Sequence, residues 1–252
     1  MTTGDALVAE AQRFAADLTA TVQAVVGGHV EAFGARALHR QGLDHVSVRQ
    51  EPRTGIPLTV DGAPLLNLTA EYYCVWDSPG QYLAVDESAV KVYAGAKAAG
   101  EPLFRYEYLR AATGDVPGAH VQIHGHRDAL TFVMTRAGVG SPRGQRLAGR
   151  VAQGAAVPQM SDLHFPVGGS RFRPSLEDVL DMLVRELGVD HEKGWREALA
   201  AGRERWRRMQ IRAVVRDAPG EAVAALQQLG YEVRLPDGLS APQDNYSRLH
   251  EL

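Results

Sequence analysis

Apolar residues recur every three or four positions in the first part of the chain, which is the period of an amphipathic helix. They line one face between positions 5 and 26, and Gly27-Gly28 follows where the helix is expected to end. The same spacing at positions 30–38 predicts a second, shorter helix. Residues 1–50 are therefore predicted to form an N-terminal helical region.

The pattern changes after position 50 to alternating apolar and polar residues separated by turn residues, which is typical of β-strands. Asp61-Gly62 lies between two apolar runs and favours a type I′ hairpin turn. Because the strands are short and follow one another through short turns, we expect an antiparallel sheet and an α+β fold. Further strands are expected within 72–76, 82–85, 89–93, 103–109 and 119–124.

A strong helical period returns at 176–187, where Ser175 can cap the first turn and Gly188 can end the last one. This helix completes a central region, residues 51–190. Within that region, 138–158 is predicted to be a loop, although its regularly spaced arginines also allow a short basic helix.

Residues 191–252 form a third predicted region. It should contain an arginine-rich helix over about 192–216, a short helix over 221–229, a strand over 231–235 and a mobile tail. The N-terminal and C-terminal helices are both expected to pack on the central sheet.

The composition narrows the class of protein. Of the 252 residues 45% are hydrophobic and 23% charged, which is typical of a folded soluble chain. Cys74 is the only cysteine, which excludes a disulfide framework and a zinc site built on paired cysteines. The first residues lack the pattern of a secretory signal, and no apolar run is long enough for a membrane helix. We therefore expect a cytoplasmic protein with no membrane partner.

The charge is unevenly distributed. The whole chain has a formal net charge of −3, but residues 193–216 contain eight basic and two acidic residues and carry +6, which leaves −9 on the rest. The average therefore excludes only nonspecific coating by nucleic acid, because one localised surface could still contact RNA or an acidic partner. A solvated helix face is the alternative interpretation.

Four of the nine histidines are concentrated in the central region. Three of them alternate with other residues in one predicted strand, so they should share a face, and the fourth should lie on a neighbouring strand. The strand predicted within 103–109 places Arg105 and Glu107 between aromatic residues. Together these residues form the candidate catalytic set: His120, His124, His126, His164, Arg105 and Glu107.

Such a polar surface suits metal-independent cleavage of a phosphodiester. Neutral imidazoles can act as general base and general acid, and we expect His124 and His164 to be this pair. Arginine can neutralise charge that develops on the phosphate. The candidate substrate-binding residues, taken from the histidine region, the glycine-rich turn before position 175 and the basic helix, are Arg127, Arg171, Arg173, Arg203, Arg207 and Arg208.

Two alternatives to a metal-independent enzyme remain open. In the first, a hydrolase, three of the imidazoles at His120, His124, His126 and His164 hold a divalent metal such as zinc with an open position for water. In the second, the chain is not an enzyme, and its long helices form a homodimer or bind a regulator. A solvated surface strand is a further interpretation of the histidines, since clustering of titratable groups is only probabilistic evidence for a site.

The order of these motifs resembles the histidine-rich TumE-like toxins of bacterial toxin–antitoxin pairs. The similar stretch lies within Tyr72–Leu187, and its motifs are Phe104-Arg-Tyr-Glu-Tyr108, the three histidines of 120–126, Leu163-His-Phe-Pro166 and the leucine-periodic helix that follows. The resemblance implies an RNase-like activity, RNA as substrate and an antitoxin partner that carries a DNA-binding domain.

Overall fold

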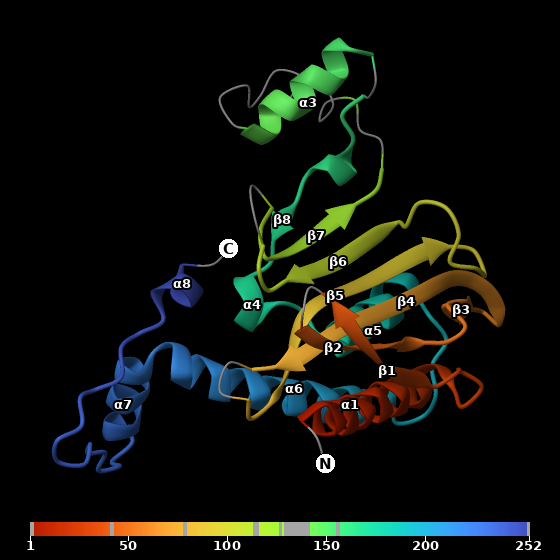
Figure 1. The fold of residues 1–252 in the computed structure, drawn as a ribbon. Coiled ribbons are helices and arrows are strands. Elements are labelled where there is room, and N and C mark those ends of the chain that lie inside the picture. The colour runs from red at the N-terminus through yellow and green to blue at the C-terminus, as the bar shows by residue number, and fades with distance from the viewer. Residues whose placement is uncertain are drawn as a thin grey trace.

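The computed structural model of the protein describes residues 3–40, 43–77, 80–112, 116–125, 128, 142–154 and 157–250 (Figure 1). The first part of the chain forms α1 (Thr3–Val26), β1 (Phe33–Arg40), β2 (Leu43–Gln50), β3 (Ile56–Val60), β4 (Ala63–Trp76), β5 (Leu83–Ala94), β6 (Phe104–Leu109) and β7 (Ala119–Ile123). The second part forms α3 (Pro142–Ala152), the 3-10 turn η1 (Met160–Asp162), β8 (Phe165–Pro166), α4 (Gly169–Phe172), α5 (Leu176–Leu187), α6 (Trp195–Asp217), α7 (Pro219–Gln228) and α8 (Tyr246–Leu249).

The described strands form one antiparallel sheet of eight strands, in the order β1-β2-β4-β5-β6-β7-β8. The strand β3 lies off this path and pairs with the first half of β4. This arrangement confirms the predicted α+β fold with an antiparallel sheet. Among the described residues, no helix is both long enough and apolar enough to cross a membrane.

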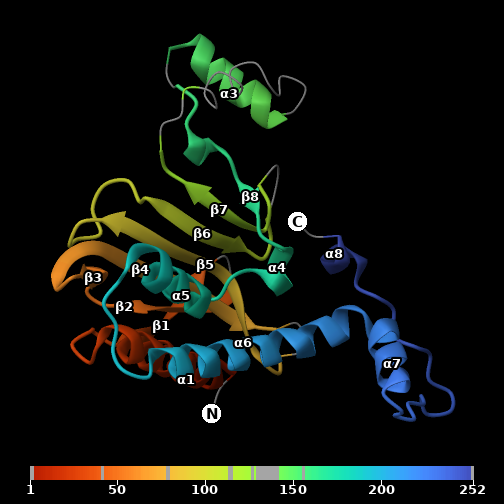
Figure 2. The same cartoon turned by 180° about the vertical axis from the view of Figure 1, so that it is seen from behind.

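Three helices, α1, α5 and α6, lie on one face of the sheet (Figure 2). Their apolar residues meet those of the sheet in a single core, and the ring of Phe14 on α1 lies 5.1 Å from the ring of Tyr72 on β4. Cys74 belongs to this core and is fully buried, and burial raises the pKa of its thiol to about 12. The opposite face of the sheet is therefore the one on which polar strand residues can gather.

The predicted hairpin turn is confirmed between β3 and β4. Asp61 and Gly62 both have positive φ angles, 51° and 76°, as a type I′ turn requires. Their backbone N–H groups donate to the Asp190 carboxylate at 3.1 and 2.8 Å, so the segment after α5 anchors the turn.

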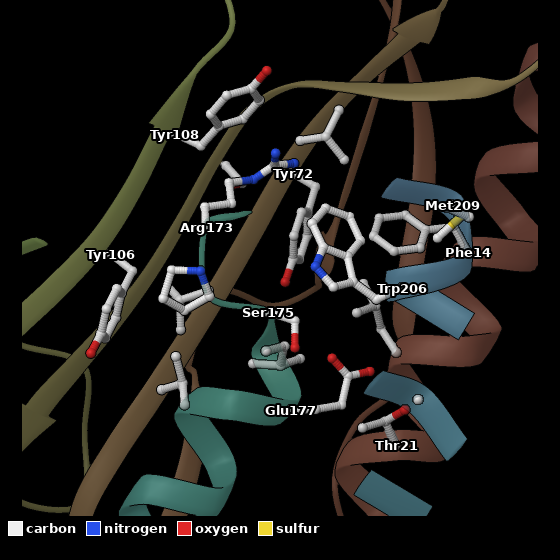
Figure 3. Close-up of a pocket in the computed structure, with 18 of the residues that line it drawn as sticks. Phe14, Thr21, Tyr72, Tyr106, Tyr108, Arg173, Ser175, Glu177, Trp206 and Met209 are labelled. Carbon is white, nitrogen blue, oxygen red and sulfur yellow. The ribbon is translucent and has the colours of Figure 1, made fainter. Parts of the chain in front are cut away.

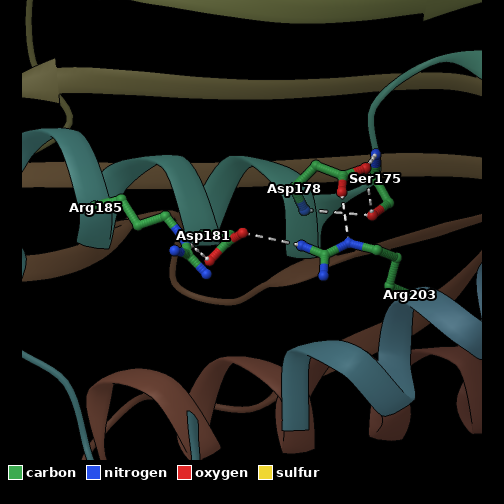
Figure 4. Close-up of polar contacts among 5 residues, drawn as sticks. All are labelled: Ser175, Asp178, Asp181, Arg185 and Arg203. Atoms are coloured by element: carbon green, nitrogen blue, oxygen red, sulfur yellow. Dashed lines mark hydrogen bonds and ion pairs between the residues drawn. The ribbon is translucent and has the colours of Figure 1, made fainter. Parts of the chain in front are cut away.

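The helix α5 begins and ends where the sequence predicts. Ser175 and Asp178 form a capping box, in which the Ser175 N–H donates to Asp178 at 2.9 Å and the Ser175 hydroxyl accepts from the Asp178 N–H. Arg203 of α6 donates to Asp178 at 2.7 Å and to Asp181 at 3.4 Å (Figure 4). Asp178 therefore stabilises both the start of α5 and its packing on α6.

Replacing Asp178 with alanine is expected to lower the free energy of unfolding by about 0.5–2 kcal/mol, the usual effect of removing a cap. Burial alone would raise the pKa of Asp178, but the hydrogen bonds from Ser175 and Arg203 hold it below its usual value. This contribution should therefore be complete above the ordinary pKa of aspartate and decline as the pH falls towards the lowered one. Urea unfolding at several pH values measures it, with Glu186→Gln at an exposed position of α5 as control. Equal losses in the two variants would contradict the prediction.

Two predicted elements are wrong. Residues 33–40 form a strand rather than a helix, because every residue of β1 pairs with β2 and a short apolar run fits both periods. Residues 33–50 therefore belong to the sheet and not to a helical region. Residues 231–235 are not a strand, and Tyr231 is 64% exposed with no described strand beside it to bond its backbone.

The helices predicted in the C-terminal half of the chain are present, and the tail contains one further short helix. The arginine-rich helix is α6, the short helix is α7, and the basic helix allowed within 138–158 is α3. The expected mobile tail contains α8, whose N-cap residue Asn245 donates its N–H to the Asp217 carbonyl at 2.8 Å. Figure 1 shows α7 projecting away from the sheet.

Candidate functional site

The strands β6 and β7 carry a row of polar side chains on the face opposite the helices. Arg105 pairs with Gln122, and Glu107 pairs with His120, in the register of the two strands. Residues that pair directly across two strands lie on the same face of the sheet, so these four side chains share one face. Tyr106 and Tyr108 alternate with Arg105 and Glu107 along β6 and therefore point to the helix side. The structure thus brings four polar residues of two neighbouring strands together.

His164 joins this row from the segment between η1 and β8. Its ring centroid lies 4.6 Å from that of His120, and its Nε2 lies 2.8 Å from Nε2 of Gln122. Gln122 also donates to the Ser161 carbonyl at 2.9 Å and accepts from Arg105. Because Arg105 must face the oxygen of the Gln122 amide and the Ser161 carbonyl must face its nitrogen, the NH₂ group of Gln122 also faces His164. In the neutral imidazole of His164 the proton then resides on Nδ1.

His120 is enclosed within the row. Only 1% of its surface is exposed, its Nδ1 lies 2.9 Å from the Pro117 carbonyl oxygen, and its Nε2 lies 3.4 Å from Glu107. Both ring nitrogens of His120 therefore face protein oxygens, and its ring packs against that of His164.

Glu107 is held in its ionised form. Burial alone would raise the pKa of its carboxyl, but the nearby imidazole of His120 and the positive charges of Arg105 and Lys91 together lower that pKa below its usual value. At neutral pH Glu107 therefore carries a negative charge and cannot act as a general acid. Its role is to offset the charge of its neighbours, among them Arg105 at 3.3 Å.

His124 lies one residue past the end of β7, where its N–H still donates to the Leu103 carbonyl at 2.8 Å. The alternation of the strand therefore continues and places His124 on the same face as His120 and Gln122. Its Nδ1 is 2.6 Å from a carboxylate oxygen of Glu101, and 12% of its side chain is exposed. Within the described part of the chain neither ring nitrogen forms a hydrogen bond, and Nε2 has no ion-pair partner either.

The predicted substrate-binding arginines lie elsewhere. Arg171 pairs with Asp217 of α6 at 2.6 Å, and Arg203 pairs with Asp178 and Asp181 of α5. Arg173 lies over the ring of Tyr108 on β6 and that of Trp206 on α6. On α6, Arg207 is exposed and Arg208 pairs with Glu204. Of these five residues, Arg173 lines the same cavity as His120, and no contact joins the other four to the described histidines. His126 and Arg127 lie outside the described residues.

Two residues that contact the histidines, Gln122 and Glu101, are absent from the candidate set predicted from the sequence. Gln122 connects Arg105 to His164, and its position on the histidine face was the only signal that could have indicated this. Glu101 approaches His124 from the turn before β6, and no sequence pattern indicated it. Within the described ranges, no group of three or more histidine, cysteine, aspartate or glutamate side chains is arranged to hold a metal ion.

Comparisons with known proteins do not place the chain in a family. No protein-family model, curated protein or solved structure matches it. The functional argument therefore depends on the geometry of the residues described above.

Proposed function

We propose that the protein cleaves RNA phosphodiester bonds by metal-independent general base catalysis at the polar row on β6 and β7. The observation that carries the proposal is the state of His124. Its Nδ1 faces the Glu101 carboxylate, while its Nε2 is buried and has no described partner. A buried nitrogen without a hydrogen bond is costly, and a substrate hydroxyl that donates to it would recover that cost.

In this reaction Nε2 of His124 takes the proton of a ribose 2′-hydroxyl, and Glu101 stabilises the imidazolium that forms. The 2′ oxygen bonds to phosphorus, and the bond from phosphorus to the 5′ oxygen breaks. The leaving oxygen takes a proton from water, and the hydroxide that remains takes the proton held by His124, which restores the neutral base. The products are a 2′,3′-cyclic phosphate and a 5′-hydroxyl end.

Positive charge and hydrogen-bond donors are available beside this base. The guanidinium of Arg105 and the ammonium of Lys91 face the same side of the sheet, because Lys91 pairs with Arg105 in the register of β5 and β6. Such groups stabilise the negative charge that develops on the phosphoryl oxygens. His164 is half-buried and its Nε2 faces the amide of Gln122, so the proposal gives it no proton-transfer step, in contrast to the expectation from the sequence.

The test is an RNA oligonucleotide incubated with the purified protein in a buffer that contains a chelator, beside the same sequence as DNA. We expect cleavage of RNA to cyclic phosphate ends and none of DNA, which lacks the 2′ nucleophile. Intact RNA, or equal cleavage of DNA, would rule out the proposal. If RNA is cleaved only in buffer without the chelator, and added zinc restores cleavage after chelator treatment, the result would instead support a metal-dependent hydrolase. The cytoplasmic toxin role that the TumE-like resemblance implies belongs to the same proposal and fails with it.

A further inference from the structure

A second site lies on the helix side of the sheet, where a cavity opens between β4, β5, β6 and the helices α1, α5 and α6 (Figure 3). Its walls are mainly aromatic and apolar, as is usual for small-molecule sites. The rings of Phe14, Tyr72, Tyr106, Tyr108 and Trp206 line it, and the exposed Met209 lies beside Phe14 and Trp206.

One end of this cavity carries a buried negative charge. Glu177, in the first turn of α5, is only 8% exposed, and Figure 3 shows its carboxylate pointing towards Trp206 and Ser175. Among the described residues, none forms a hydrogen bond or ion pair with this carboxylate. The carboxylate oxygens are not among the fully enclosed polar atoms of the described residues, so they are open to the cavity, where a positively charged group could pair with them.

The neighbouring helix is adapted to this carboxylate. Gly202 lies in the middle of α6, and a Cβ added there would overlap the side chain of Glu177. Glycine inside a helix is unfavourable and is retained where another group must approach the backbone closely. The close approach shows that α6 packs around Glu177 in this buried position.

The opposite end of the cavity is closed by a cation. The guanidinium of Arg173 lies over the rings of Tyr108 and Trp206, 3.7 and 4.7 Å from their centroids. It therefore repels a second positive charge from that end. Arg205 and the carboxylates of Asp17 and Glu107 also line the cavity, and Glu177 is the buried one among these charged groups, so a bound cation would be directed to it. Tyr72 lies between the two charges, and its pKa is raised by burial and then by the nearby Glu177.

We propose that this cavity binds a small organic amine, whose ammonium pairs with Glu177 and whose apolar body lies among the aromatic rings. The cavity lies mainly on the helix side of the sheet, although Glu107 and His120 of the polar row also line it. The inference does not depend on RNA cleavage. A primary amine matches the observations because it supplies both a counter-charge and the apolar surface that rings such as Trp206 and Phe14 can cover.

The experiment is calorimetric titration of the full chain with two matched pairs of probes: 2-phenylethylamine with 3-phenylpropanoate, and isobutylamine with 3-methylbutanoate. Each pair has the same apolar body and opposite charge. We expect at least one amine to bind with one molecule per chain, at least about tenfold tighter than its carboxylate. Glu177→Gln, which preserves the shape of the side chain, should weaken that binding by about tenfold or more, while Glu186→Gln on the same helix should leave it unchanged.

Absence of binding by both amines, or equal binding of amine and carboxylate, would overturn the proposal. It would also be overturned if a folded Glu177→Gln variant bound the amine as tightly as the wild type. The comparison of amine with carboxylate uses the wild-type chain, so the proposal remains falsifiable even if Glu177→Gln does not fold. The failure of RNA cleavage in the other assay would leave these outcomes unaffected.

Discussion

Replacing His124 with alanine is expected to lower the rate of RNA cleavage by about 100- to 10,000-fold, the usual contribution of a positioned general base. The imidazole is the group on the polar row that has a carboxylate at one nitrogen and no described partner at the other. Its removal leaves Arg105 and the rest of the row in place, so substrate binding should change less than the cleavage step. Single-turnover cleavage of a labelled RNA measures the effect.

The matched control is His39→Ala. His39 is also a strand residue with a carboxylate beside its Nδ1, since Asp44 lies 3.1 Å away, but it is exposed at the other edge of the sheet. This variant should cleave RNA at the wild-type rate. Glu101→Gln should lie between the two, because it keeps the base and removes only the charge that stabilises its protonated form. Similar rates for His124→Ala and His39→Ala would contradict the assigned base.

Replacing Leu180 with alanine is expected to lower the free energy of unfolding by about 2–5 kcal/mol. Leu180 is 1% exposed and belongs to the core that joins α5 to the sheet and to α1 and α6. The substitution removes buried apolar surface and leaves a cavity that tightly packed neighbours can fill only in part. Urea denaturation followed by circular dichroism measures the change.

Leu187→Ala provides the comparison on the same helix. Leu187 is 40% exposed, so its truncation removes little buried surface and should cost much less than that of Leu180. The loss of stability in Leu180→Ala should also reduce amine binding and RNA cleavage together, since both sites are built on the same sheet. Equal costs at the two leucines would show that α5 is not packed as described.

Helices and turns whose ends are set by residues close in the sequence could be predicted from that sequence. The helix α5 begins at Ser175 and ends at Gly188 as expected, because a capping side chain and a left-handed glycine act within one turn of the residues that carry them. The turn at Asp61 is local in the same sense. The strand β1 was predicted as a helix because its hydrogen bonds are made with β2, and the pattern of a short run does not reveal its partner.

The candidate site also has features that local patterns predict and features that depend on distant segments. Alternation along a strand was sufficient to predict that His120 and His124 share a face and that Arg105 and Glu107 lie beside them. It was not sufficient to show that His120 is buried by surrounding chain, that Glu101 approaches His124, or that Gln122 as well as His120 contacts His164. Each of these depends on segments distant along the chain that meet only after folding.

The sequence by itself determined the α+β class, the antiparallel sheet, the capped helix and the face of the strand on which the histidines lie, because all of these follow from periodicity and local hydrogen bonding. Only the tertiary structure decided that Arg171 and Arg203 pair with aspartates of the helices, and that Glu177 is buried beside a cavity with no described partner. The physical reason is that contact between distant residues and burial of a charge depend on how helices and sheet pack around one another, which no short pattern encodes.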